Sequence, residues 1–423
     1  MKILYVSYHF PPSNTSSTSV MNYQIVKQLS ENNSLEVITM KHEKFQENNE
    51  LLDNLNKNVN INFTEPGFLH RKFYDSSGNV SKKSSKFGFK RFLKKTSKFK
   101  ELILIPDPVI DWFFIAFKKS KKVVSKSEID VIFSSATPYT SHIISFCLSK
   151  VLKKPLILFY GDPWVYEQSR KRGKFRFLFE KFIEQKIINR STHVFFVTDT
   201  TKELYLNKYR ISEKKVSTVT LGYDSNDFLE GKPRNKTGKI KFLYGGSLNP
   251  IHRNPLPFFK AISSLNNNYK EKIIFDLYTD EYDKYEELVK DYKIDNIIKV
   301  KKIIDYKNFL KEAQNADLLV LFGNSSNLQI PGKVFDFIGS QTRILLINNN
   351  MDNLNDPTHK ILSEFENNFS VLNYEKDIKE IIEHYIVNFN QNEDNKNDKT
   401  KVSKYQWKNT LKPLTNYITS FKE

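Results

Sequence analysis

The chain has 423 residues, of which 39% are hydrophobic and 14% aromatic, so it can build packed cores in two or three domains and is not globally disordered. A net charge of +18 is compatible with nucleic acids, anionic membranes and phosphorylated substrates as partners. The single cysteine, Cys147, excludes an internal disulfide, and no Cys/His cluster has zinc spacing. The start is too polar for a secretion signal, and no run reaches the ~20 apolar residues that span a bilayer, so we expect a cytoplasmic protein, soluble or peripheral.

The first half of the chain alternates short apolar segments with helical patterns. The segments typical of buried strands are residues 2–8, 35–39, 130–136, 156–161 and 193–198. Helical patterns lie between them, at residues 21–32, 141–152 and 175–189. This alternation predicts a parallel sheet covered by helices.

The basic stretch of residues 82–100, "KKSSKFGFKRFLKKTSKFK", carries nine basic residues, no acid and four phenylalanines. Basic residues interleaved with aromatic ones suit the surface of an anionic membrane. The alternative is a solvated charged loop.

The second half repeats the pattern of the first after a break. Residues 225–239 are rich in Gly, Pro, Asn and Lys without periodicity, and we predict a linker there. Strands are then predicted at residues 240–246, 273–279, 297–304, 317–323, 343–348 and 369–373. We therefore predict two similar α/β domains, residues 1–225 and 226–400. A polar connector is predicted at residues 388–404. It leads into a terminal helix within residues 401–423, which we expect Trp407 to anchor by packing against the core.

Two glycines end the first predicted strand of the second domain. Gly245 and Gly246 are followed by Arg253, and then by Pro255 and Pro257 at the start of a helix. Glycines let the backbone approach a ligand closely, and an arginine beside them can hold a phosphate with two hydrogen bonds. A plain turn is the alternative.

A second candidate element surrounds the turn Pro331–Gly332. Lys333 stands at the start of a predicted helix, where a cation and free N–H groups together can meet an anion. Asp336, three residues on, shares its helix face and can accept from ribose hydroxyls. The alternative is an exposed Lys–Asp pair.

Polar side chains also follow strands of the first domain, where open α/β sheets place their ligands. Asp162 and Trp164 come just after one strand and could contact a substrate, with Trp164 as a stacking platform. The alternative is that Asp162 caps a helix and Trp164 packs in the core. Thr137 and Tyr139 follow another strand. The loop after the first strand has no glycine between Pro12 and Val20, so only hydroxyls and N–H groups, at Ser16, Ser17 and Thr18, could meet an anion there.

No Asp-x-Asp follows an apolar strand, so the sequence gives no support for a metal site of that type. Taken together, the segments resemble a glycosyltransferase of the GT-B fold in the broad family 4, and most closely bacterial surface-polysaccharide members with an "RDPW"-type segment. The resemblance runs in order through "KILYVSYHFPP", "EIDVIFSSATPYTSHIIS", "LFYGDPW", "STVTLGYDSNDF", "FLYGGSLNPIHRNP", "IPGKVFDFIGS" and "YQW". It covers nearly the whole chain.

The resemblance implies two Rossmann-like domains facing a central cleft, with the terminal helix crossing back to the first domain. It implies a nucleotide-sugar donor on the second domain, at Gly245, Gly246, Arg253, Asn254, Pro331, Gly332, Lys333 and Asp336, with Ser16 and Ser17 of the first domain approaching it. It implies a lipid-linked or glycan acceptor on the first domain, at Thr137, Tyr139, Asp162 and Trp164. Arg253 and Lys333 would stabilise the departing diphosphate, so neither metal nor other cofactor is expected.

Several positions depart from the family pattern. Leu328 stands where many relatives have a glutamate that contacts the donor sugar, and Gly161 replaces the arginine of "RDPW". Arg343 stands in place of a usual proline. The family mostly retains the anomeric configuration with help from the leaving phosphate, so no general base is assigned and Asp162 is only a candidate.

Three functions stay open at this stage. The first is a retaining glycosyltransferase, with a UDP-sugar as the favoured donor, that builds surface glycans on the inner face of the plasma membrane, where residues 82–100 would contact anionic lipid. The second is a sugar-nucleotide epimerase of the same fold, which His9, His142 and His252 are too scattered to support. The third is a basic membrane- or nucleic-acid-binding protein without catalysis; it leaves the polar sites at the strand ends unexplained, and no nucleic-acid partner is expected.

Overall fold

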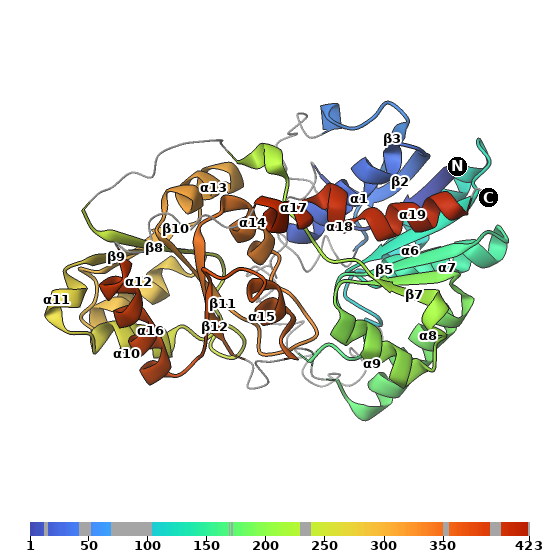
Figure 1. The fold of residues 1–423 in the computed structure, drawn as a ribbon. Helices are drawn as coiled ribbons and strands as arrows, with labels where there is room; N and C mark the ends of the chain where they lie inside the picture. The colour runs from blue at the N-terminus through green and yellow to red at the C-terminus, as the bar shows by residue number, and fades with distance from the viewer. Residues whose placement is uncertain are drawn as a thin grey trace. The chain divides into compact units, whose positions relative to one another are not determined.

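The computed structural model describes residues 1–11, 16–41, 52–68, 104–168, 170, 172–228, 238–349, 355–389 and 399–421. The chain divides into two compact units (Figure 1). Unit 1 comprises Met1–Thr220 together with Leu411–Glu423, and unit 2 comprises Leu221–Thr410. The basic stretch 82–100 lies outside the described residues, so its contact with a membrane stays a prediction.

Unit 1 is built on a seven-stranded parallel sheet of order β3-β2-β1-β4-β5-β6-β7. The order reverses between β1 and β4, as in doubly wound nucleotide-binding folds. The strands are β1 (Lys2–Val6), β2 (Ser34–Met40), β3 (Val59–Thr64), β4 (Val131–Ala136), β5 (Leu156–Tyr160), β6 (His193–Phe196) and β7 (Val216–Thr218).

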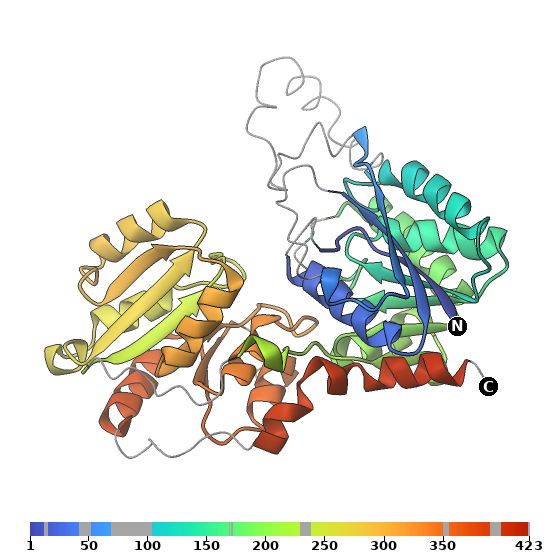
Figure 2. The ribbon, with the colours of Figure 1, turned by 90° about the horizontal axis from the view of Figure 1, so that it is seen from above.

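Helices cover both faces of this sheet because successive side chains of a strand point to opposite sides. Tyr5 of β1 points to one face, where its hydroxyl donates to Asn22 of α1 at 2.8 Å. Its neighbours Leu4 and Val6 point to the other face and join the core cluster of Trp112 from α6. Figure 2 shows α6 and α19 on opposite sides of the sheet. The helices are α1 (Ser17–Ser30), α6 (Trp112–Val124), α7 (Thr140–Val151), α8 (Lys174–Arg190), α9 (Asp199–Tyr209), the 3-10 turn η2 (Glu213–Lys215) and α19 (Lys412–Ser420).

Unit 2 repeats this topology with a six-stranded parallel sheet of order β10-β9-β8-β11-β12-β13. Its strand order reverses between β8 and β11. The strands are β8 (Ile240–Gly245), β9 (Ile273–Thr279), β10 (Ile298–Lys302), β11 (Leu318–Phe322), β12 (Arg343–Asn348) and β13 (Phe369–Leu372).

Two core clusters fill the two faces of the second sheet. One packs the sheet against α10, α12 and α16, and the other packs it against α13, α14, α15 and α17. The helices and 3-10 turns are η3 (Ser225–Asp227), α10 (Leu256–Ser263), α11 (Asn267–Lys270), α12 (Tyr282–Asp291), α13 (Tyr306–Asn315), α14 (Lys333–Ser340), α15 (Pro357–Leu362), α16 (Glu375–Val387), α17 (Lys399–Lys404) and α18 (Trp407–Thr410). The predicted fold class, α/β with two Rossmann-like sheets, is confirmed.

The C-terminal segment is broken where the sequence predicts one helix. Trp407 of α18 is buried in unit 2, whereas α19 belongs to unit 1 and starts anew with Pro413 in its first turn. Tyr417 of α19 stacks on His193 of β6 with the ring centroids 4.0 Å apart. A proline is tolerated in the first turn of a helix but not in its interior, which explains the break.

No helix among the described residues is both long and apolar enough to cross a bilayer.

Candidate functional site

The unit 2 residues predicted to bind the donor lie at the carboxyl end of the unit 2 sheet. They come from the loop after β8, the loop after β11 and the start of α14, beside the point where the strand order reverses. In open α/β sheets this point is the usual place for a ligand, because neighbouring loops diverge there. The topology and the predicted residues therefore point to the same place in unit 2.

Position 246 requires a glycine for two reasons: its backbone conformation, and the space that the side chain of Lys333 occupies beside it. Its φ is +137°, a conformation that side chains rarely adopt, and its N–H donates to the carbonyl of Tyr278 at 2.8 Å. A Cβ at this position would lie 1.4 Å from Nζ of Lys333, so the lysine occupies the space that the glycine leaves. Gly245 has a different role, because a Cβ there would lie 2.2 Å from the ring of Phe309. The missing side chain at Gly245 thus leaves room for the ring of Phe309, and the one at Gly246 leaves room for Lys333.

Lys333 is the first residue of α14, directly after the Pro331–Gly332 turn. Gly332 caps the helix without a side-chain hydrogen bond, and the first-turn N–H groups of a helix favour anions. The ammonium of Lys333 lies 5.1 Å from the ring centroid of Tyr244, which holds it against the end of β8. Burial and then the nearby Arg253 cation lower the pKa of Lys333 to about 7. An anion placed here would relieve both effects.

Arg253 is held by the loops after β8 and β11. A backbone bridge pairs it with Asn249, through hydrogen bonds of 2.8 and 3.2 Å, and its Nε donates to Oδ1 of Asn324 at 3.2 Å. Beside it, Nδ1 of His252 lies 2.8 Å from the hydroxyl of Ser325. The guanidinium is therefore oriented by the fold and lies near enough to Lys333 to affect its pKa.

Asn254 is tied into the fold on both sides. Its side chain accepts from the N–H of Leu256 at the start of α10, and its carbonyl accepts from Asn373 at 2.9 Å. These hydrogen bonds give Asn254 a structural role in the fold. Its contact with a donor stays a prediction.

Asp336 lies one turn after Lys333 and accepts a hydrogen bond from the hydroxyl of Tyr306, at 2.7 Å. Burial raises the pKa of this carboxyl to about 7, and the hydroxyl of Tyr306 opposes the shift. The sequence does not indicate Tyr306, because it stands at the start of α13, 30 residues before its partner, in a segment without any motif. Leu328, in the place of the family's second glutamate, is buried.

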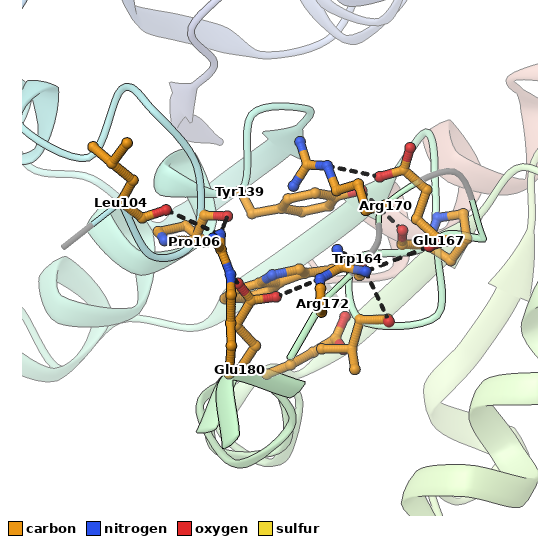
Figure 3. Close-up of polar contacts among 12 residues, drawn as sticks. Leu104, Pro106, Tyr139, Trp164, Glu167, Arg170, Arg172 and Glu180 are labelled. Carbon is orange, nitrogen blue, oxygen red and sulfur yellow. Dashed lines mark hydrogen bonds and ion pairs between the residues drawn. The ribbon is translucent and has the colours of Figure 1, made fainter. Parts of the chain in front are cut away.

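In unit 1, the ring of Tyr139 stacks on that of Trp164, the last residue of the Asp162–Trp164 turn (Figure 3), and both side chains are buried. Their ring centroids lie 5.1 Å apart and the rings are nearly parallel, at 9°. The hydroxyl of Tyr139 donates to the carbonyls of Pro163, at 3.0 Å, and Asp162. Both side chains are fully buried, which argues against the stacking platform predicted for Trp164; the packed tryptophan that the sequence left open as an alternative fits better.

The same turn is held by a buried ion network that the sequence does not reveal. Glu180 of α8 is fully buried and pairs with Nε of Arg172 at 2.8 Å and of Arg176 at 2.6 Å. Arg172 also donates to the carbonyl of Trp164 at 2.6 Å, as Figure 3 shows. The guanidinium of Arg170 lies over the ring of Tyr139, 5.6 Å from its centroid, and Arg170 pairs with Glu167. Carboxylate and guanidinium groups therefore fix the turn from beneath.

The remaining predicted residues of unit 1 lie at neighbouring strand ends. Thr137 follows β4 and is half-buried. Ser16 is the N-cap of α1, where its hydroxyl accepts from the N–H of Ser19 at 3.3 Å, and Ser17 is exposed in the first turn. Ser16 therefore already has a structural role as a helix cap. Their contacts with a donor or an acceptor stay predictions.

Comparison with solved structures identifies the architecture. A sucrose-phosphate synthase from Thermosynechococcus elongatus superposes with a TM-score of 0.67 at 12% identity, covering 100% of this chain and 99% of that one. HepE from Anabaena, solved with UDP, has a TM-score of 0.60 at 10% identity and coverage of 100% and 97%. WaaB, a lipopolysaccharide outer core galactosyltransferase, has a TM-score of 0.59 at 11% identity and covers 99% of both chains. This chain has the GT-B fold.

The family model of Glycosyltransferase Family 4 matches residues 87–227 of this GT-B chain. The resemblance to that family is thereby confirmed, over a segment that includes Tyr139, Asp162 and Trp164. No curated protein matches the chain in sequence.

With UDP as a diphosphate probe of this site, replacing Gly246 with alanine is expected to lower the affinity at least about tenfold, because the new methyl group displaces the ammonium of Lys333. The strained backbone should also cost about 1–3 kcal/mol of stability. Gly238→Ala is the matched control, since Gly238 has a φ of +78° with no atom near its Cβ. Calorimetric titration of both variants with UDP should show the loss only for Gly246→Ala. Equal affinities would contradict the placement of Lys333 in the site.

UDP affinity is expected to fall as the pH rises from 7 to 9, by up to about tenfold per unit. Burial brings the pKa of Lys333 to about 7, so in the free protein its ammonium is lost above that pH. A bound diphosphate favours the ammonium, and binding above pH 7 must therefore take up a proton. Titrations in buffers of different ionisation enthalpy measure that uptake. Lys333→Ala should reduce this uptake to the part contributed by the Asp336 carboxyl, and an affinity that does not change with pH would contradict the assignment.

Proposed function

We propose that this chain is a glycosyltransferase that moves a sugar from a nucleotide-sugar donor, with UDP-sugars as the first candidates, to a lipid-linked or polysaccharide acceptor. One observation carries the proposal: Arg253 and Lys333 converge with the start of α14 at the switch point of the unit 2 sheet. Two cations and a helix N-terminus suit a diphosphate. HepE, which shares the fold, was solved with UDP and with UDP-glucose, which supports the choice of donor class.

In the proposed reaction Arg253 and Lys333 stabilise the negative charge that develops on the departing nucleoside diphosphate. Charge stabilisation of this kind is worth most in a partly buried site, and burial is what lowers the pKa of Lys333. The two cations would then do the work that a divalent metal does in other transferases, so activity should persist in EDTA. Asp336, held by Tyr306, would accept from the ribose hydroxyls.

The acceptor is proposed to bind unit 1 at the strand ends that carry Thr137 and Asp162. The rings of Tyr139 and Trp164 and the Glu180 network would position the backbone of the Asp162 turn rather than contact the acceptor directly. Retention of the anomeric configuration, a role in capsule, O-antigen or related surface glycans, and a location on the inner face of the plasma membrane all belong to this proposal. WaaB, named as a lipopolysaccharide galactosyltransferase, shares the fold and supports the surface-glycan role.

Screening purified protein against UDP-, GDP- and CMP-sugars, with mass spectrometry of the products, tests the function. We expect one nucleotide class to be hydrolysed slowly and its sugar to be transferred once an acceptor is present. The absence of both nucleotide binding and hydrolysis across the panel would overturn the proposal.

An epimerase of the same fold is the second candidate and would act on the donor alone. Of its three candidate histidines, His142 is fully buried against Ser134, and burial lowers its pKa to about 3. It therefore cannot work as an acid near neutral pH, which disfavours this function. A change of the donor sugar without any acceptor would favour it.

A further inference from the structure

Helix α8 carries its two acidic residues inward and four of its large apolar residues outward. Glu180 and Glu184 are fully buried, whereas Phe175, Leu178, Phe179 and Phe182 are between 45% and 68% exposed. Their spacing of three, four and seven residues places all four on one face of the helix. We call this set the α8 apolar face. Single exposed apolar residues are ordinary, but a contiguous set marks a surface that binds something.

The two glutamates do not contribute charge to that outer side. Glu180 is neutralised by Arg172 and Arg176, and Glu184 accepts from the hydroxyls of Tyr205 and Tyr209. They are the only acidic residues of α8, so the solvent side of the helix has no negative charge.

Cations border the α8 apolar face. Lys174 and Lys186 are exposed and Lys181 is half-buried. The ammonium of Lys186 lies 5.3 Å from the ring centroid of Phe182, so a cation and an aromatic ring already lie together. Phenylalanine and leucine flanked by lysine are the composition of helices that lie in the surface of an anionic bilayer.

We propose that the α8 apolar face docks unit 1 on an anionic lipid bilayer, with the rings in the acyl boundary and the lysines at the headgroups. A second copy of the chain would bring Lys174, Lys181 and Lys186 against their own counterparts, which like charges oppose. Residues 82–100 of the chain, with nine basic residues and no acid, would likewise bring like charges against these lysines. Lipid phosphates complement the charge, and acyl chains complement the rings. This docking does not depend on sugar transfer.

Co-sedimentation of the full chain with vesicles tests the proposal. The vesicles are phosphatidylcholine alone or phosphatidylcholine with about 30% phosphatidylglycerol. We expect binding to the anionic vesicles that falls at least about tenfold in Phe179→Ser/Phe182→Ser. Lys174→Glu/Lys186→Glu should lose it as well. The matched control is Phe114→Ser/Val151→Ser, which alters exposed apolar residues of α6 and α7 (75% and 57% exposed) and should bind like the unaltered chain.

Circular dichroism and melting of each variant establish that it is folded, and substitutions to serine at exposed positions should be neutral for folding. Anionic-vesicle binding that Phe179→Ser/Phe182→Ser leaves unchanged would overturn the proposal, and so would binding lost only when the lysines of 82–100 are replaced. Equal binding to neutral vesicles would overturn the part played by Lys174 and Lys186. An oligomer that dissociates in the same double variant would assign the face to self-association instead.

Discussion

Replacing Lys333 with alanine is expected to lower kcat/KM for the nucleotide-sugar donor by about 10²–10³-fold, the effect of removing one group that stabilises charge in a transition state. The fold should not suffer. Burial lowers the pKa of Lys333, which means that its ammonium costs the free protein stability, so the variant should be as stable as the unaltered chain or slightly more stable. Steady-state rates with the identified donor, together with thermal melting, measure both quantities.

Two further variants make this test specific. Arg253→Ala should lower the rate comparably, because its guanidinium acts on the same anion. Lys260→Ala, on the exposed side of α10, removes one positive charge from unit 2 outside the site and should leave the rate unchanged. Full activity of either Lys333→Ala or Arg253→Ala would contradict the assignment of that residue to the diphosphate.

Replacing Glu180 with glutamine is expected to destabilise unit 1 by about 3–5 kcal/mol, since it leaves two partly buried guanidinium groups without their counter-charge. The loss should also loosen the Asp162 turn, because Arg172 holds the carbonyl of Trp164. Denaturant unfolding followed by tryptophan fluorescence reports on this unit, as Trp112 and Trp164 both lie in its core.

Glu128→Gln is the control for that experiment. Glu128 also pairs with a cation, Lys154 at 3.4 Å, but its side chain is 86% exposed. A surface ion pair of this kind contributes about 0–1 kcal/mol, so the control should shift the unfolding transition little. Similar shifts for the two variants would show that the Glu180 network does not stabilise the fold.

Most strands of both sheets were predictable because they lie within apolar runs bounded by turns. The two strands that the sequence did not indicate are β3 and β7, which lie at the edges of the unit 1 sheet. β3 reads "VNINFT", with two asparagines that donate to Glu36 of β2, and β7 has three residues, so neither shows an apolar run. Edge strands are often short and polar, which removes the very signal that identifies a buried strand.

The candidate site was predictable only where residues lie close together in the sequence. Lys333 and Asp336 share one helix turn, and Gly246 adjoins a strand end, so spacing alone suggests them. Tyr306 holds Asp336 from another helix, and Glu180 is a buried counter-charge for Arg172. Neither residue belongs to a recognisable sequence motif. The sequence could not reveal that the side chain of Trp164 is buried rather than exposed to a ligand, because nothing in the local sequence distinguishes the two cases.

The division of the chain into units has a consequence for synthesis on the ribosome. Unit 2 is one continuous stretch, and it can fold once Thr410 has left the exit tunnel. Unit 1 is discontinuous: the rings of His193 and Phe195 on its sheet are covered by Tyr417 of α19. The part of unit 1 that is synthesised first is therefore completed last, and the sheet face around β6 stays without its α19 cover while unit 2 emerges.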